Sequence, residues 1–117
     1  MSMTKIYGIK NCDTMKKAFK WLEENNVTYE FHDYKKQGID EEVLRAAIHE
    51  HGWENAINRR GPSWHKLPDA VKDTMDEETA IAAANENSSI VKRPLLTHNG
   101  KTYLGFKDEI YKTVFKK

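Results

Sequence analysis

The chain has 117 residues, a length typical of one domain, and its 38% hydrophobic and 10% aromatic content argues against full disorder despite 32% charged residues. Nineteen basic and eighteen acidic residues leave a net charge of +1, which excludes a strong electrostatic footprint for nucleic acid or an anionic membrane. Cys12 is the only cysteine, which excludes an internal disulfide and a four-cysteine zinc site. No apolar run approaches the ~18 residues of a membrane span, and residues 1–7 lack a signal-peptide core. We therefore expect a soluble, cytoplasmic monomer that binds no membrane and no nucleic acid directly.

The first third of the chain predicts a β-α-β arrangement over residues 4–36. Residues 4–9 read as a strand, and residues 27–34 carry the β-branched and aromatic residues of a second one. Between them an apolar stripe at helical spacing predicts a helix that runs to about Asn25. Its N-cap is expected at Asp13 or Thr14. The stripe consists of Met15, Ala18, Phe19 and Leu22.

The middle of the chain, residues 40–90, reads as a helical insertion. Asp40 is expected to cap a helix with two acidic residues in its first turn, which Gly52 ends. A short piece over 53–58 and a single turn over 63–67 are expected next, and a helix follows from Asp76 to Glu86.

The last third, residues 91–117, predicts a β-β-α arrangement. Asn99-Gly100 between two apolar runs is a strong signal for a β-hairpin. Residues 107–115 then read as a closing helix, with Ile110 and Val114 facing inward and Tyr111 a further candidate. The whole chain is therefore expected to be one α/β domain, 1–117, with a small mixed sheet and a helical insertion between its two halves.

Cys12 is the residue most suited to chemistry, because it lies between a predicted strand and the start of a predicted helix. Unpaired backbone N–H groups and the helix dipole stabilise a thiolate there and lower its pKa. Lys10 and the two lysines that follow Met15 add positive charge nearby in the sequence. The competing interpretation is a buried, inert thiol, since free cysteine is among the most buried residue types.

A redox role for Cys12 requires a thiol from outside the chain. Met15 occupies the position that a second cysteine would take in a Cys-x-x-Cys motif. The resolving thiol would then come from glutathione or another protein.

Two arginines are candidates for binding an anion. Arg60 lies in a predicted middle loop, and Arg93 directly precedes Pro94. The planar guanidinium group suits carboxylates and other oxyanions, although both could be ordinary surface charges. The five histidines lack metal-ligand spacing on any predicted face, and we expect no metal site.

Several strings of the sequence resemble the arsenate-reductase-like family, which comprises the ArsC, Spx and YffB branches. The strings are Ile6-Tyr7-Gly8-Ile9-Lys10-Asn11-Cys12-Asp13-Thr14, Asn58-Arg59-Arg60-Gly61 and Lys92-Arg93-Pro94-Leu95-Leu96. Nearly the whole chain is covered, and the first and last strings are most similar to the YffB branch. The resemblance implies a thioredoxin/glutaredoxin-like fold in which Cys12 is the nucleophile and Pro94 a cis-proline beside it. It also implies anion binding by Arg93 and by Arg60, or by Arg59 after a one-residue shift.

These expectations favour an oxidoreductase, a monothiol reductase that uses glutathione as co-substrate and binds no resident cofactor. Arg60 and Arg93 would hold glutathione carboxylates, and exposed backbone at Pro94 would align the ligand. Lys10, Asn11, Asp13 and Thr14 complete the candidate site around Cys12.

Two alternatives follow from the same resemblance. One is arsenate reduction linked to glutathione and glutaredoxin, although Lys107 stands near the place where arsenate reductases carry a further arginine. The other is a Spx-like regulatory module that binds a protein without catalysis, although Met15 replaces the second cysteine of typical Spx regulators.

Overall fold

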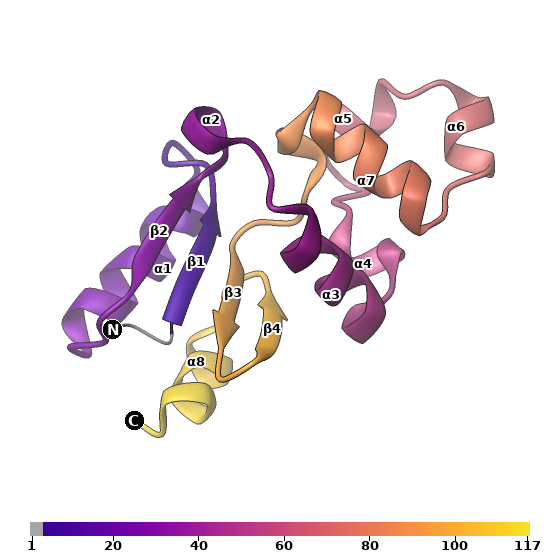
Figure 1. Ribbon diagram of the computed structural model, residues 1–117. Coiled ribbons are helices and arrows are strands. Elements are labelled where there is room, and N and C mark those ends of the chain that lie inside the picture. Colours follow the sequence, from indigo (N-terminus) through magenta and orange to yellow (C-terminus); the bar gives the residue numbers. More distant parts are fainter. Residues whose placement is uncertain (1–3) are drawn as a thin grey trace. The chain divides into compact units, whose positions relative to one another are not determined.

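The computed structural model describes residues 4–117, and these form two compact units (Figure 1). The first unit comprises the chain up to Tyr34 together with Arg93–Lys117. The second, Lys35–Lys92, is helical and contains the insertion predicted over residues 40–90. The two halves of the first unit are therefore separated in sequence by the whole helical unit.

A four-stranded mixed sheet forms the centre of the first unit, in the order β2-β1-β3-β4. Strand β1 (Thr4–Gly8) pairs in parallel with β2 (Glu30–Asp33) and antiparallel with β3 (Leu95–His98). Strand β4 (Lys101–Leu104) pairs antiparallel with β3. The predicted α/β class, with β-α-β and β-β-α halves in one mixed sheet, is confirmed, although β2 is shorter than the predicted 27–34.

The hairpin between β3 and β4 follows from its two turn residues. Asn99 and Gly100 both have positive φ, 51° and 79°, as a two-residue turn that matches the twist of the strands requires. Glycine adopts this conformation freely, and asparagine tolerates it better than most residues.

Helices α1 (Asp13–Glu24) and α8 (Asp108–Phe115) cover the sheet face that carries the core. Ile6 of β1 and Leu96 of β3 are paired neighbours on that face. Trp21 links the two helices, because its indole N–H donates to the Asp108 carboxylate at 2.7 Å. The buried residues of this core are Ile6, Met15, Ala18, Trp21, Leu22, Leu96 and Tyr111.

One prediction about inward-facing residues is wrong. Ile110 is 43% exposed, whereas Tyr111 is fully buried and packs edge-on against Trp21 and Phe106. In α1 the predicted apolar stripe is confirmed, because Met15, Ala18 and Leu22 are buried and half-buried Phe19 packs against the core. Trp21 is buried as well, although it was not predicted to be.

The helical unit consists of short helices joined by tight turns. They are α3 (Glu41–His51), α4 (Trp53–Ala56), α5 (Pro62–His65), α6 (Asp69–Asp73), α7 (Glu77–Glu86) and the 3-10 turn η1 (Ser88–Ile90), and the helical turn α2 (Tyr34–Gln37) precedes them. The predicted cap is present, since Asp40 accepts from the Val43 N–H at 3.1 Å. Asp76, which was predicted as the first helical residue, is also an N-cap and accepts from the Thr79 N–H at 2.8 Å. Helix α6 and turn η1 were not predicted, because neither carries a full apolar stripe.

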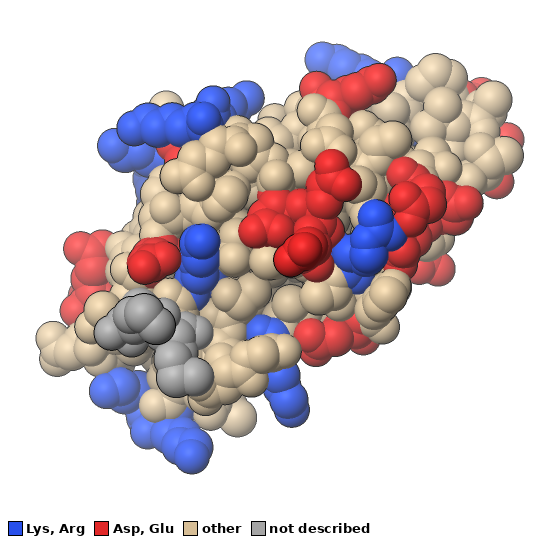
Figure 2. Space-filling model, in the orientation of Figure 1, with Lys and Arg blue, Asp and Glu red and all other residues tan. Residues whose placement is uncertain are grey.

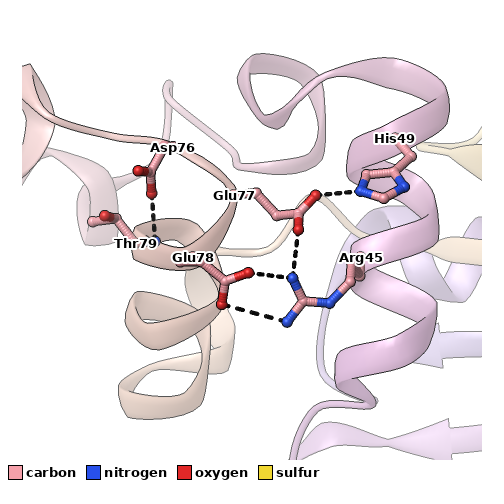
Figure 3. Close-up of polar contacts among 6 residues, drawn as sticks. All are labelled: Arg45, His49, Asp76, Glu77, Glu78 and Thr79. Atoms are coloured by element: carbon pink, nitrogen blue, oxygen red, sulfur yellow. Dashed lines mark hydrogen bonds and ion pairs between the residues drawn. The ribbon is translucent and has the colours of Figure 1, made fainter.

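Charged side chains join α3 to α7 (Figure 3). Arg45 of α3 contacts the carboxylates of both Glu77 and Glu78 of α7, and His49 contacts Glu77 as well. The Arg45 hydrogen bond is the main cause that lowers the pKa of Glu77. Because the Arg45 and Glu78 side chains are substantially exposed, solvent screens this network.

The face shown in Figure 2 carries acidic and basic groups side by side rather than one sign of charge. This distribution agrees with the net charge of +1. Among residues 4–117 no helix is long and apolar enough to cross a membrane.

Candidate active site at Cys12

Cys12 occupies the N-cap of α1, at the junction between β1 and the helix. Its backbone is extended, with φ −139° and ψ 129°, and its carbonyl oxygen accepts from the Lys16 N–H at 3.0 Å. The N-cap predicted at Asp13 or Thr14 is therefore wrong by one or two residues. Because the loop between β1 and α1 is short, the Cys12 thiol lies where a capping side chain would meet the unpaired N–H groups of the first helical turn.

The pKa of Cys12 lies below its ordinary value. Partial burial of the sulfur opposes ionisation and acts to raise the pKa, but three groups outweigh it. They are the backbone N–H of Met15, the Arg93 side chain and the backbone N–H of Thr14. The sulfur is thus stabilised as a thiolate by the start of the helix and by one guanidinium group.

The thiol is half-buried and packs at the margin of the core. The alternative interpretation of an inert, fully buried cysteine is therefore not what the structure shows. A half-exposed thiolate can attack a sulfur atom of a small disulfide.

Sheet topology brings Arg93 to Cys12 across 81 positions of sequence. Strands β1 and β3 are antiparallel, with Tyr7 opposite Leu95. The segment that leaves β1 toward Cys12 therefore lies beside the segment that enters β3 from Arg93, at the same end of the two strands. The Arg93 side chain hydrogen-bonds to the thiol.

Pro94 follows Arg93 through a cis peptide bond, as the family resemblance implied. Its side chain is fully buried, and its carbonyl oxygen accepts from the Gly105 N–H at 2.9 Å. The expected exposed backbone at Pro94 is therefore wrong, since proline also lacks an N–H to offer. Half-buried Arg93 is the group at this position that could contact a ligand.

The other predicted residues of the first loop surround the thiol in sequence. Lys10, Asn11 and Asp13 are exposed and Thr14 is half-buried. Of these, Thr14 contacts the sulfur through its backbone N–H, which lowers the pKa of Cys12. Side-chain roles for Lys10, Asn11 and Asp13 stay predictions.

Arg60 belongs to the helical unit, where it lines a pocket with Arg59 and Lys92. Sequence reasoning considered Arg59 only as an alternative to Arg60 and did not single out Lys92. The signal available was the clustering of cations in Asn58-Arg59-Arg60 and Lys92-Arg93. A part for Arg60 in chemistry at Cys12 stays a prediction.

The sequence matches the ArsC family over residues 7–114. The chain belongs to the ArsC family. An uncharacterized protein of Haemophilus influenzae is 40% identical over 113 residues, which cover 97% of this chain and 99% of that protein. A YffB protein of known structure is 48% identical, with a TM-score of 0.90 over 95% of this chain and 97% of the other. The global transcriptional regulator Spx of Streptococcus agalactiae is 25% identical over 92% of this chain and 79% of its own length.

These similarities confirm the resemblance to the arsenate-reductase-like family. Members of the ArsC family have an arsenate reductase-like fold, which suggests an oxidoreductase. The similar proteins also include the Spx regulators. The choice between catalysis and regulation therefore depends on the residues at the site.

Proposed function

We propose that this ArsC-family protein is a glutathione-dependent monothiol reductase that acts on disulfides or mixed disulfides. The observation that carries the proposal is the half-exposed Cys12 thiol, whose pKa is lowered at the N-terminus of α1 beside Arg93. A lone activated thiol can begin thiol–disulfide exchange but cannot resolve its own intermediate, so an external thiol is needed.

The reaction balances in two exchange steps. The Cys12 thiolate attacks the glutathione sulfur of a mixed disulfide, forms a new S–S bond and releases the other thiol as a thiolate, which takes up a proton. A glutathione thiolate then attacks the Cys12–glutathione disulfide, which yields oxidised glutathione and restores the Cys12 thiolate. Over the cycle one free glutathione is consumed and the substrate thiol is released, while the glutathione that the substrate carried leaves as the other half of the oxidised glutathione.

Arg93 serves both steps in this mechanism. Its guanidinium hydrogen-bonds to the sulfur and favours the thiolate, which is the nucleophile in the first step and the leaving group in the second. Exposed Lys10 and Asn11 are proposed to meet the carboxylate and amide groups of glutathione.

Mass spectrometry of the intact protein after incubation with oxidised glutathione tests the proposal. We expect one glutathione adduct per chain, mapped to Cys12 and removed by added glutathione. Steady-state reduction of a glutathione mixed disulfide should be lost in Cys12→Ser and retained in Lys20→Gln, a matched exposed change on the same helix. An unmodified Cys12, or turnover that survives Cys12→Ser, would refute the proposal.

Arsenate reduction is a second candidate, favoured by membership of the ArsC family. Cys12 would attack arsenic, and glutathione with glutaredoxin would supply the electrons. Against it weighs that only Lys107 stands near the place where arsenate reductases carry a further arginine. Arsenate-dependent oxidation of glutathione in the presence of glutaredoxin, compared between the native protein and Cys12→Ser, decides this case.

A Spx-like regulatory role is the third candidate, favoured by the similarity to Spx. It predicts binding to RNA polymerase that Cys12→Ser leaves unchanged. Retention of polymerase by the immobilised protein, without any thiol reductase turnover, would favour regulation over catalysis.

A further inference from the structure

Three segments of the sheet unit meet at the end of the strands where the reactive thiol lies. Leu95, at the start of β3, pairs with Tyr7 in β1 and with Leu104, the last residue of β4. The end of β1, the start of β3 and the end of β4 therefore lie side by side. The loop that follows β1 carries Cys12, and the loop that follows β4 leads to α8 (Figure 1).

The loop after β4 is attached directly to the segment that precedes β3. The Gly105 N–H donates to the Pro94 carbonyl oxygen at 2.9 Å. Arg93, the residue before Pro94, hydrogen-bonds through its side chain to the Cys12 sulfur. The residue after Gly105, Phe106, therefore lies at the margin of the site.

A glycine turn directs Phe106 to the side of the sheet on which Cys12 lies. Tyr103 packs against the core, so its neighbour Leu104 faces the opposite side of the sheet. Gly105 has a φ of 77°, in the left-handed region that glycine adopts freely. After this turn Phe106 packs against the same core as Cys12.

Phe106 is the one aromatic residue among residues 9–14, 93–94 and 104–107, the segments that meet at this end of the sheet. It is half-buried. Its ring packs edge-on against the fully buried ring of Tyr111, with centres 4.7 Å apart and an angle of 83° between the planes. One side of the ring is thus held by the core while the remainder is accessible. A side chain held in this way gives up little conformational freedom when a ligand binds.

The groups around the thiol suit the two halves of a mixed disulfide differently. Lys10, Asn11 and Asp13 are exposed and Arg93 is half-buried, and these charged and polar groups suit the charged glutathione half. An aromatic ring instead gains from contact with alkyl groups and with sulfur. Phe106 therefore suits an apolar group on the other half.

We propose that Phe106 is a specificity-determining residue, which selects glutathione mixed disulfides whose other half carries an apolar group next to its sulfur. This inference rests on the proposed function, because it names the substrate class of the same site. The alkyl group packs on the Phe106 ring while polar groups hold the glutathione half. Each methylene group removed from water in this way strengthens binding, so affinity rises with the length of the alkyl group.

Binding of two S-alkyl glutathiones tests the proposal, because a thioether resembles the mixed disulfide but cannot be reduced. Calorimetric titration compares S-hexylglutathione with S-methylglutathione, which differ in the length of the alkyl group. We expect the native protein to bind S-hexylglutathione about tenfold more tightly, the effect of burying roughly two methylene groups. In Phe106→Ala the two affinities should differ by less than about threefold, whereas Phe106→Leu, which keeps an apolar side chain, should retain most of the preference.

Phe115→Ala is the matched control. Phe115 is also a half-buried phenylalanine that packs against the same core and against Tyr111. However, its ring lies 4.8 Å from that of His98, the last residue of β3, at the other end of the strands from the thiol. Phe115→Ala should therefore leave the preference for S-hexylglutathione unchanged. Circular dichroism confirms that each variant is folded before its affinities are compared.

Equal affinity of the native protein for the two ligands would overturn the proposal without recourse to any variant. A preference that survives in Phe106→Ala, a preference that is lost equally in Phe115→Ala, or a lack of saturable binding would overturn it too. Formation of the glutathione adduct at Cys12 is measured separately. An adduct without a preference for the hexyl group would refute only the role of Phe106, whereas a protein that forms no adduct would refute the proposed function as well.

Discussion

Arg93 contributes to the reactivity of Cys12 through the hydrogen bond and the charge of its guanidinium group. Removing that group should be visible in the pH dependence of Cys12 alkylation. Arg93→Gln removes both the charge and its hydrogen bond to the thiol, so the pKa of Cys12 should rise toward the ordinary value of about 8.5. The alkylation rate by iodoacetamide, measured from pH 5 to 10, should shift to higher pH. Below the pKa the rate should fall by up to about tenfold, because one pKa unit is a tenfold change in thiolate fraction.

A matched control for this experiment is Lys20→Gln, which removes one exposed positive charge from α1, the helix whose N-cap is Cys12. Its pH profile should coincide with that of the native protein. Superimposable profiles for the native protein and Arg93→Gln would show that the helix start alone activates Cys12.

Gly8 ends β1 in close contact with the side chain of Met15. A Cβ atom at this position would lie 2.5 Å from the Met15 Sδ and 2.7 Å from its Cε, and Met15 is fully buried. We therefore expect Gly8→Ala to lower the free energy of unfolding by about 1–3 kcal/mol, as overpacking of a core does. Urea denaturation measures it.

The clash at Gly8 should disappear when Met15 is shortened. In a Met15→Ala background, Gly8→Ala should cost much less, which gives a coupling of about 0.5–3 kcal/mol in the double-mutant cycle. Additive effects of the two substitutions would show that the sulfur moves aside freely.

At the scale of the element, helix α3 depends on its cap. Asp40 accepts the N–H of Val43, which has no partner within the helix. Asp40→Ala should lower stability by about 1 kcal/mol, whereas Asp40→Asn, which keeps a capping oxygen, should cost less. Thermal unfolding followed by circular dichroism measures both variants, and equal losses would argue against the cap.

The contacts of α3 with α7 should depend on pH through Glu77. The pKa of Glu77 is lowered in the folded protein by Arg45, so its carboxylate favours folding above the ordinary value near 4.5. That contribution should disappear as pH falls through the lowered folded pKa. Urea unfolding of Glu77→Gln should therefore show lower stability than the native protein at pH 7 and equal stability in strong acid. A difference that persists at low pH would mean that the network in Figure 3 is not the cause.

For the whole molecule, one thiol per chain limits what oxidation can produce. With Cys12 as the only cysteine, a monomer cannot form an internal disulfide. Treatment with the thiol oxidant diamide should therefore give no monomer with an internal disulfide. When glutathione is added as well, the protein should be converted to the singly glutathionylated form. Non-reducing electrophoresis and intact mass measure both outcomes. More than one glutathione per chain would contradict the assignment to Cys12.

The separation of the chain into two units also bears on its chemistry. Cys12, Arg93 and Pro94 belong to the sheet unit, whereas Arg60 belongs to the helical unit. The activation of the thiol can therefore be explained within the sheet unit alone.

Local patterns in the sequence were sufficient for most of the elements. The Asp40 cap and the Asn99-Gly100 turn each act over a few residues, so the sequence alone predicts them. The position of Cys12 before a helix was predicted for the same reason. The N-cap itself was misplaced, because the length of the turn after β1 decides which residue is the last extended one.

Contacts between distant segments were decided only by the tertiary structure. The pairing of β1 with β3 brings Arg93 to Cys12, and the bridge between Ile57 and Val91 brings Lys92 to Arg59; no local pattern encodes either. The burial of Tyr111 in place of Ile110 depends on Trp21, which lies on another helix. The sequence by itself thus determined the elements and the reactive residue, because hydrogen bonds and dipoles at helix ends are local. The groups around that residue depend on packing between distant segments, which only the folded chain establishes.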